Sequence, residues 1–231
     1  MKLEKANREY LAFLTSRPDQ WTSHYNLGNY YLNRGDLIKA QNSFETAVRL
    51  EPRATLALVN ASIVYAQMGD NTKALKSLQK ALKIPPENAT ANFNMGLLKA
   101  ELQDFKMSEK YLRATLKADP KLAEVAYNLS ILLSKDRLSE AIEWSKKAFE
   151  LRSNARYEYT FAYYVYQNKE FDRAAQILHQ IIQQWPAYGD TYLLLSKIYQ
   201  KQGKIEKALS IYHQALNKEG LSEQDRYRLQ S

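Results

Sequence analysis

The stretch HYNLGNYYLNRGDLIKAQNSFETAVRLEP, from His24 to Pro52, decides the fold because its pattern returns at a fixed distance. The stretch NFNMGLLKAELQDFKMSEKYLRATLKADP, from Asn92 to Pro120, has the same glycine, acidic residue and final proline in the same places. A period of 34 residues separates the members of two sets, which are Asp36, Asp70 and Asp104, and Pro52, Pro86 and Pro120. Such self-similarity predicts a repeat protein.

The period divides the chain into six units, and the fourth is two residues shorter than the others. The units are 21–54, 55–88, 89–122, 123–154, 155–188 and 189–222. In the first unit, apolar residues recur every three or four residues on both sides of a break at Gly35 and Asp36, residues that suit the end of one helix and the start of the next. Pro52 then ends the second helix. Each unit is therefore predicted to be a helical hairpin, and the protein to be all-α.

The repeated residues carry a resemblance to a known family. The first unit has Leu27, Gly28, Tyr31, Ala40, Phe44, Ala47 and Pro52 at the pattern positions, and the second has Ala61, Ser62, Tyr65, Ala74, Leu78, Ala81 and Pro86. This pattern resembles the tetratricopeptide repeat. The resemblance implies a right-handed α-solenoid of helix-turn-helix repeats whose first helices line a concave groove. It also implies a non-catalytic scaffold that binds an extended peptide or a partner helix in that groove.

The two ends extend the pattern. Residues 1–20 place Ala6, Tyr10, Phe13 and Pro18 where the second helix of a unit would have them, which predicts a half repeat. At the other end, Ser222 and Asp225 form a capping-box-like start for a polar cap helix over residues 223–231. Because the chain starts halfway through a unit, we expect it to be part of a larger protein.

One asparagine per unit stands at the sixth position, which the resemblance directs into the groove. These residues are Asn26, Asn60, Asn94 and Asn128, and Asn29 lies at a further groove position. A primary amide both donates and accepts hydrogen bonds, so a ladder of amides can hold a peptide backbone without selecting its side chains. The alternative is that these amides bond across adjacent helices.

The fifth position is mostly aromatic, with Tyr25, Phe93, Tyr127 and Tyr159 beside Val59 and Leu193. Exposed aromatic rings along a groove favour binding of peptide side chains. Packing between helices is the alternative interpretation.

The stretch ARYEYTFAYYVYQ, Ala155 to Gln167, has a register that one residue decides. If the unit begins at Ala155, Ala162 takes the close-approach position that holds glycine or serine in other units. Tyr159, Tyr163 and Tyr166 then face the groove, and Tyr157 and Tyr164 flank it. The register therefore predicts an aromatic wall, with Ala162 buried and Tyr163 exposed.

The formal net charge of +8 raises the question of an acidic partner or nucleic acid. Few of these charges fall at groove positions, so nucleic-acid binding is the less favoured alternative. Lys197 and Lys201 make the groove modestly basic towards its end and suit an acidic segment of a partner. Self-association of the chain is a second alternative. A carboxylate clamp of the co-chaperone kind is not expected, because Tyr25, Thr90 and Asn94 replace its three cations.

The sequence also limits chemistry and location. Without cysteine, the chain has no disulfide, zinc-thiolate site or thiol catalysis. Its three histidines include His179 and His213, whose spacing of 34 follows from the repeat, and we expect no metal, cofactor or enzymatic activity. No apolar run approaches the roughly 18 residues of a membrane span. The start MKLEKANREY has no apolar segment of a signal peptide, and the compartment stays open.

Overall fold

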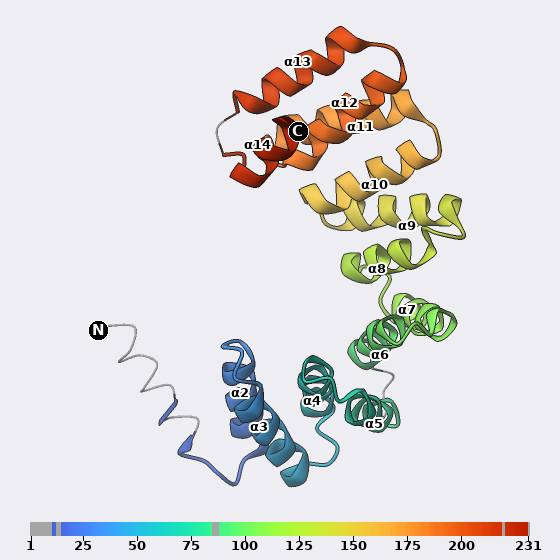
Figure 1. Cartoon of the computed structure of the whole chain (residues 1–231). Helices are drawn as coiled ribbons and strands as arrows, with labels where there is room; N and C mark the ends of the chain where they lie inside the picture. The colour runs from blue at the N-terminus through green and yellow to red at the C-terminus, as the bar shows by residue number, and fades with distance from the viewer. Residues whose placement is uncertain (1–10, 13–14, 85–87, 219, 231) are drawn as a thin grey trace. The chain divides into compact units, whose positions relative to one another are not determined.

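The computed structural model describes residues 11–12, 15–84, 88–218 and 220–230. Most of the half repeat predicted for residues 1–20 lies outside these ranges, including Ala6, Tyr10 and Phe13. The described residues form α-helices and turns, and they contain no strand. The protein is therefore all-α, with consecutive helical hairpins in the manner of an α-solenoid (Figure 1).

The chain forms two compact units, which are residues 1–120 and 121–231. The first contains α2 (Trp21–Leu32), α3 (Leu37–Leu50), α4 (Thr55–Gln67), α5 (Asn71–Leu82), α6 (Ala89–Glu101) and α7 (Phe105–Ala118). The second contains α8 (Ala123–Leu133), α9 (Leu138–Leu151), α10 (Ala155–Gln167), α11 (Phe171–Gln184), α12 (Gly189–Lys201), α13 (Ile205–Leu216) and α14 (Glu223–Gln230).

The turn inside each hairpin of the first compact unit has a repeated chemistry. The side chains of Asp36, Asp70 and Asp104 cap α3, α5 and α7 by accepting a hydrogen bond from the backbone N–H three residues later. Such a bond satisfies one of the N–H groups that a helix start leaves free. The aspartates at a spacing of 34 are therefore helix caps.

Small and large side chains alternate where the two helices of a hairpin cross. A Cβ atom added to Gly28 would lie 2.5 Å from the ring of Phe44, which is fully buried. Ala162 is also fully buried, whereas Tyr163 is 37% exposed. The register predicted for residues 155–188 is therefore confirmed at these two positions.

Four pairs of successive first helices contact each other within the compact units. In the first unit α2 contacts α4 and α4 contacts α6, and in the second α10 contacts α12 and α12 contacts α14. We call the surface formed by these helices the first-helix face of that unit. The second helices, such as α3, α5, α11 and α13, contribute the opposite side of each hairpin and leave the first-helix face open.

Candidate functional site

Five aromatic rings form a chain in the second compact unit, and we call it the aromatic wall. Its residues are Tyr159, Tyr163, Tyr166, Phe171 and Tyr188. The Tyr163 ring lies 6.3 Å from Tyr159 and 6.3 Å from Tyr166. Tyr166 continues to Phe171 at 5.7 Å, and Tyr159 meets Tyr188 edge-on at 5.6 Å. These separations lie in the range where aromatic pairs attract one another.

Exposure along the aromatic wall is uneven. Tyr163 is exposed, while Tyr159 and Tyr166 are half-buried. Their spacing of four and three residues places all three on one side of α10. Because neighbouring rings support each side chain, a partner would meet rings already held in place, which reduces the entropy lost on binding.

The end of the aromatic wall formed by Tyr159 and Tyr188, near the start of α12, is the more enclosed one. Burial raises the pKa of the Tyr159 phenol, and the nearby Asp190 carboxylate raises it further. Burial and Asp190 likewise raise the pKa of Tyr188. Both phenols therefore stay neutral near pH 7 and remain available as hydrogen-bond donors.

Positive charge borders the other end of the aromatic wall. The ammonium group of Lys201 lies 5.3 Å from the ring centre of Tyr166 and 6.0 Å from that of Phe171. These are cation–π distances. Lys197, one turn earlier on α12, is exposed. Both lysines therefore lie on the helix that adjoins the aromatic wall.

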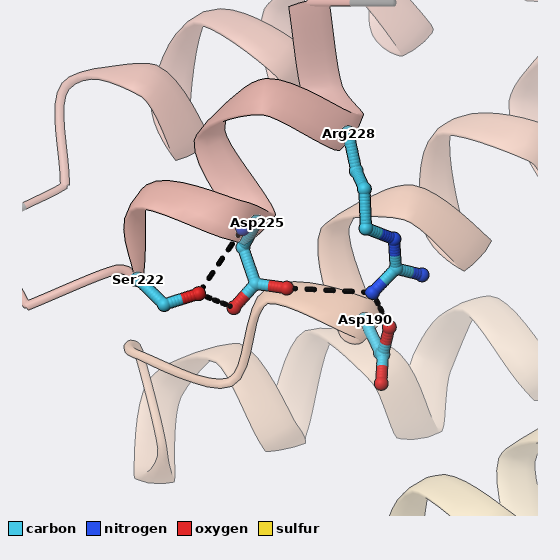
Figure 2. A network of polar contacts seen from close by, with 4 residues as sticks. All are labelled: Asp190, Ser222, Asp225 and Arg228. Carbon is cyan, nitrogen blue, oxygen red and sulfur yellow. Dashed lines mark hydrogen bonds and ion pairs between the residues drawn. The ribbon is translucent and has the colours of Figure 1, made fainter.

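Asp190, at the start of α12, is engaged by the last helix. Figure 2 shows that Arg228 of α14 contacts both Asp190, at 2.8 Å, and Asp225, at 3.4 Å. Ser222 donates to the Asp225 carboxylate at 2.7 Å and accepts from its backbone N–H at 3.0 Å. The ion pair to Arg228 offsets the charge of Asp190, which leaves the α12 side of the aromatic wall with a basic balance.

Gly189 explains how α14 approaches α12 so closely. A Cβ atom added at this position would lie 2.4 Å from Cγ of Asp225. Only glycine leaves room for that carboxylate in the present packing. Ser222 caps α14 through the backbone N–H of Asp225, as the capping-box-like pattern predicts, and the contact of Asp225 with Gly189 positions α14 against α12.

Tyr127 does not have the exposed position that was expected for the aromatic residues along the groove. Its ring is buried and stacks on Tyr157 at 4.7 Å, and its hydroxyl accepts a hydrogen bond from Nε of Arg156 at 2.8 Å. Tyr157 and Tyr164, expected beside the groove, are buried as well. These rings fill space between helices, so a bound peptide would not reach them without rearrangement.

The asparagine positions differ from one another. Asn60 donates to the side-chain oxygen of Asn29 at 2.7 Å, so these two amides bond across α4 and α2. Asn94 and Asn128 each donate to a backbone carbonyl of their own helix, at 2.8 Å. Asn26 is exposed. Because Asn60, Asn94 and Asn128 each donate one N–H, the second N–H and the oxygen of each remain available to a ligand.

Two further predicted groove residues lie in the first compact unit. Tyr25 is half-buried between Trp21 and Phe44, with ring separations of 6.2 Å and 6.1 Å. Phe93 is half-buried on α6. Each of these rings is thus partly taken up by packing and partly accessible.

Phe171 and Tyr188 belong to the aromatic wall, although the sequence analysis did not place them in a site. Phe171 is the first residue of α11, and Tyr188 is the last residue before α12. Both flank helix ends, where helical periodicity gives no direction. The aromatic residues just before α12, Trp185 and Tyr188, are the signal that could have drawn attention to this connection.

Metal-ligating side chains are scattered over the described residues. No group of three or more His, Asp or Glu side chains in them could hold a metal ion. His179 instead makes a hydrogen-bond contact of 2.8 Å with the hydroxyl of Tyr199, which links α11 to α12. In the part of the chain that the structure describes, no helix combines the length and the apolar character needed to cross a membrane.

Comparison with known structures places this architecture among repeat proteins. A chain of the APC/C hetero-tetramer Cut9–Hcn1 matches over 98% of this chain and 45% of its own, with 16% identity and a TM-score of 0.70. It thus spans less than half of that protein. PilF of Pseudomonas aeruginosa matches over 91% of this chain and 96% of its own, with 20% identity and a TM-score of 0.73.

A third similar structure is YrrB, described as a TPR protein with an unusual peptide-binding site. It matches over 78% of this chain and 93% of its own, with 19% identity and a TM-score of 0.57. At these identities the likeness concerns the fold alone. No curated protein matches the sequence.

The sequence itself matches the tetratricopeptide repeat in both compact units. The matches cover residues 21–54, 89–122 and 165–229, and a further TPR repeat match covers residues 63–103. The period of 34, the paired helices and the small residues at the helix crossings agree with these matches. The chain belongs to the tetratricopeptide repeat family.

Proposed function

We propose that this chain is a non-catalytic scaffold that binds an extended peptide segment of a protein partner, with the aromatic wall as its main contact. The repeats support a role in protein–protein interaction in general. The observation that carries the finer proposal is the exposed Tyr163 ring held between Tyr159 and Tyr166, with Lys201 beside it.

The chemistry of this surface suits a peptide with apolar and acidic side chains. Preorganised rings provide apolar area at a low entropy cost, which is a feature of residues that dominate binding energies. Lys197 and Lys201 add an attraction for carboxylates that salt weakens. Asp190 does not oppose an acidic peptide, because its charge is offset by the ion pair with Arg228.

The asparagines of the first compact unit would form a separate contact surface for a peptide backbone. The free oxygen and remaining N–H of Asn60 can meet one peptide group, and Asn26 and Asn94 can do the same on neighbouring first helices. Because Asn60 is already fixed by its bond to Asn29, it presents these groups in a defined direction. The proposal is consistent with the peptide-binding site named for the similar protein YrrB.

The proposal is tested by selecting peptides from a phage-displayed random library on the full chain. Selected peptides are then titrated against wild type and the double variant Tyr163→Ser/Tyr166→Ser. We expect at least about a tenfold loss of affinity, because each aromatic ring that packs on a partner contributes on the order of 1 kcal/mol or more.

A matched control is Tyr227→Ser, which removes an exposed tyrosine on α14 that lies outside the aromatic wall. This variant should bind the selected peptides like wild type. Failure to enrich any peptide, or equal binding by the double variant, would contradict the proposal. The asparagine contribution is tested separately by Asn60→Ala/Asn94→Ala, for which unchanged affinity would remove these amides from the site.

Self-association stays a prediction of the sequence analysis. Sedimentation velocity over a wide range of protein concentrations tests it. A sharp monomer at the highest concentration would count against it.

A further inference from the structure

A cleft lies between the second helices α3 and α5 of the first compact unit. We call it the outer furrow. Its volume is about 580 Å³, within the range of roughly 300–1,000 Å³ found for ligand sites. Its floor is apolar and comes from Val48, Leu58, Ala61 and Ile84. Leu58 and Ala61 are almost fully buried, so the floor is recessed below the surrounding side chains.

Three cations line the outer furrow. They are Arg49 of α3, Lys80 of α5 and Lys83 just after α5, and all three side chains are exposed. Among the described residues, none of the three forms an ion pair, although Lys39, Lys73 and Lys99 in the same compact unit do. The cations of the outer furrow are therefore available to an external anion.

Among the described residues that line the outer furrow, the one carboxylate, Glu45, is engaged within the protein. Glu45 accepts a hydrogen bond from the hydroxyl of Tyr65 at 2.8 Å and another from Nε2 of Gln41 at 2.8 Å. Burial, followed by the bond to Glu45, raises the pKa of the Tyr65 phenol, so this donor stays protonated. Glu45 is thus turned towards Tyr65, and the balance of charge around the furrow is positive.

The second compact unit contains an equivalent cleft with different chemistry. It measures about 530 Å³ and lies between α9 and α11, with Phe149, Glu158, Ile177, Gln180 and Gln183 among its residues. The repeats that contain these residues begin at residues 55 and 155, so Lys80 and Lys83 correspond to Gln180 and Gln183. The same helical position is therefore charged in one cleft and neutral in the other.

From this difference we infer that the outer furrow is a binding site for an acidic peptide segment that carries an apolar side chain. The apolar side chain lies on the floor formed by Val48, Leu58 and Ile84. Carboxylates before and after it pair with Arg49, Lys80 and Lys83. The cations of the site come from α3 and from α5 and its C-terminal end, part of its floor comes from α4, and the site does not depend on the aromatic wall.

The shape of the outer furrow favours a peptide over other anionic partners. Single-stranded nucleic acid binds through exposed aromatic rings that stack with bases, and the one ring here, Tyr65, is only 8% exposed. A membrane surface would require apolar side chains that project from the protein, whereas Leu58 and Ala61 lie at the bottom of a cleft. An apolar side chain of a peptide, flanked by carboxylates, fits both the recessed floor and the charged rim.

The inference is tested by methyl NMR on the full chain with a defined probe, the peptide acetyl-Glu-Glu-Leu-Glu-Glu-amide. We expect the methyl signals of Val48, Leu58 and Ile84 to shift with a dissociation constant of about 1 mM or tighter. The methyl signal of Ile177, in the cleft of the second compact unit that lacks these lysines, should stay in place. The peptide acetyl-Gln-Gln-Leu-Gln-Gln-amide should bind at least about fivefold more weakly, since exposed ion pairs each contribute a modest attraction.

The variant Lys80→Gln/Lys83→Gln gives the outer furrow the two glutamines found at the equivalent positions of the other cleft and should weaken binding of the acidic peptide about fivefold. Lys76→Gln/Lys106→Gln removes the same charge from exposed positions outside the furrow and should leave binding unchanged. Absence of shifts at the furrow methyls overturns the inference. So does an equal response of Ile177, equal binding of the glutamine peptide, or equal weakening by the control variant.

Discussion

Gly28 provides a quantitative test of how the helices of a hairpin fit together. Replacing it with alanine puts a Cβ atom 2.5 Å from the Phe44 ring, whereas ordinary contacts begin at 3.4 Å. The ring must therefore move by about 1 Å, and Phe44 is fully buried. Overpacking of this kind costs about 1–3 kcal/mol, and we expect the upper end because the ring has no open side. The better helix propensity of alanine returns about 1 kcal/mol.

The expected net loss for Gly28→Ala is about 2 kcal/mol in the free energy of unfolding. Gly96→Ala is the matched control, because its Cβ atom would lie 3.0 Å from the flexible end of Leu112 and needs a smaller shift. Its packing cost of about 1 kcal/mol should be offset by the gain in helix propensity, so its stability should change little.

A rescue experiment separates overpacking from other causes. In the second hairpin, buried Ser62 has a Cβ atom at the position equivalent to Gly28, and Leu78 stands at the position of Phe44. Phe44→Leu should therefore make room for Ala at position 28, with a coupling energy of about 1–2 kcal/mol between the two substitutions. Urea denaturation measures these energies, and hydrogen exchange of α2 and α3 locates them, because repeat proteins can open locally. Equal stability of Gly28→Ala and Gly96→Ala, or no rescue by Phe44→Leu, would refute the reasoning.

Three other predictions test separate parts of the structure. Gln103→Gly and Lys169→Gly should each raise the free energy of unfolding by about 0.5–1 kcal/mol, because these residues have φ of 59° and 64° where related turns use glycine; urea denaturation checks this, and lower stability would contradict it. Gly189→Ala should push Asp225 away and speed hydrogen exchange of α14, with exchange of α10 unchanged; normal exchange in α14 would show that the close contact is unimportant. Because the pKa of Tyr159 is raised in the folded state, its stabilising contribution is complete below the usual pKa of 10.0 and is lost as the pH rises above it. Tyr159→Phe should therefore reduce the fall in the free energy of unfolding at alkaline pH. An identical fall in both proteins would contradict this.

The repeat period was sufficient to predict the hairpins and the register of α10. Burial of Ala162 and exposure of Tyr163 follow from helical geometry alone, because a side chain's face depends on its position in the unit. Periodicity likewise directed Tyr127 towards the groove, yet its ring is buried. The direction of a large side chain depends on its neighbours, and here Tyr157 and Arg156 hold the ring between helices.

Contacts between distant residues were beyond the sequence pattern for the same reason. The bond between Asn29 and Asn60 depends on the distance between two helices, which the period does not specify. The outer furrow was hidden because Lys80 and Lys83 look like ordinary charges on an exposed helix side. Only the packing of α4 against both α3 and α5 places them around a recessed apolar floor.

The most direct test of the proposed function is NMR of the full chain with isotope-labelled tyrosine, titrated with a peptide selected on the wild-type protein. We expect the signals of Tyr163 and Tyr166 to shift on binding, while those of the buried Tyr157 and Tyr192 stay in place. Saturable binding that leaves Tyr163 and Tyr166 unshifted would contradict the assignment of the aromatic wall as the peptide-binding surface.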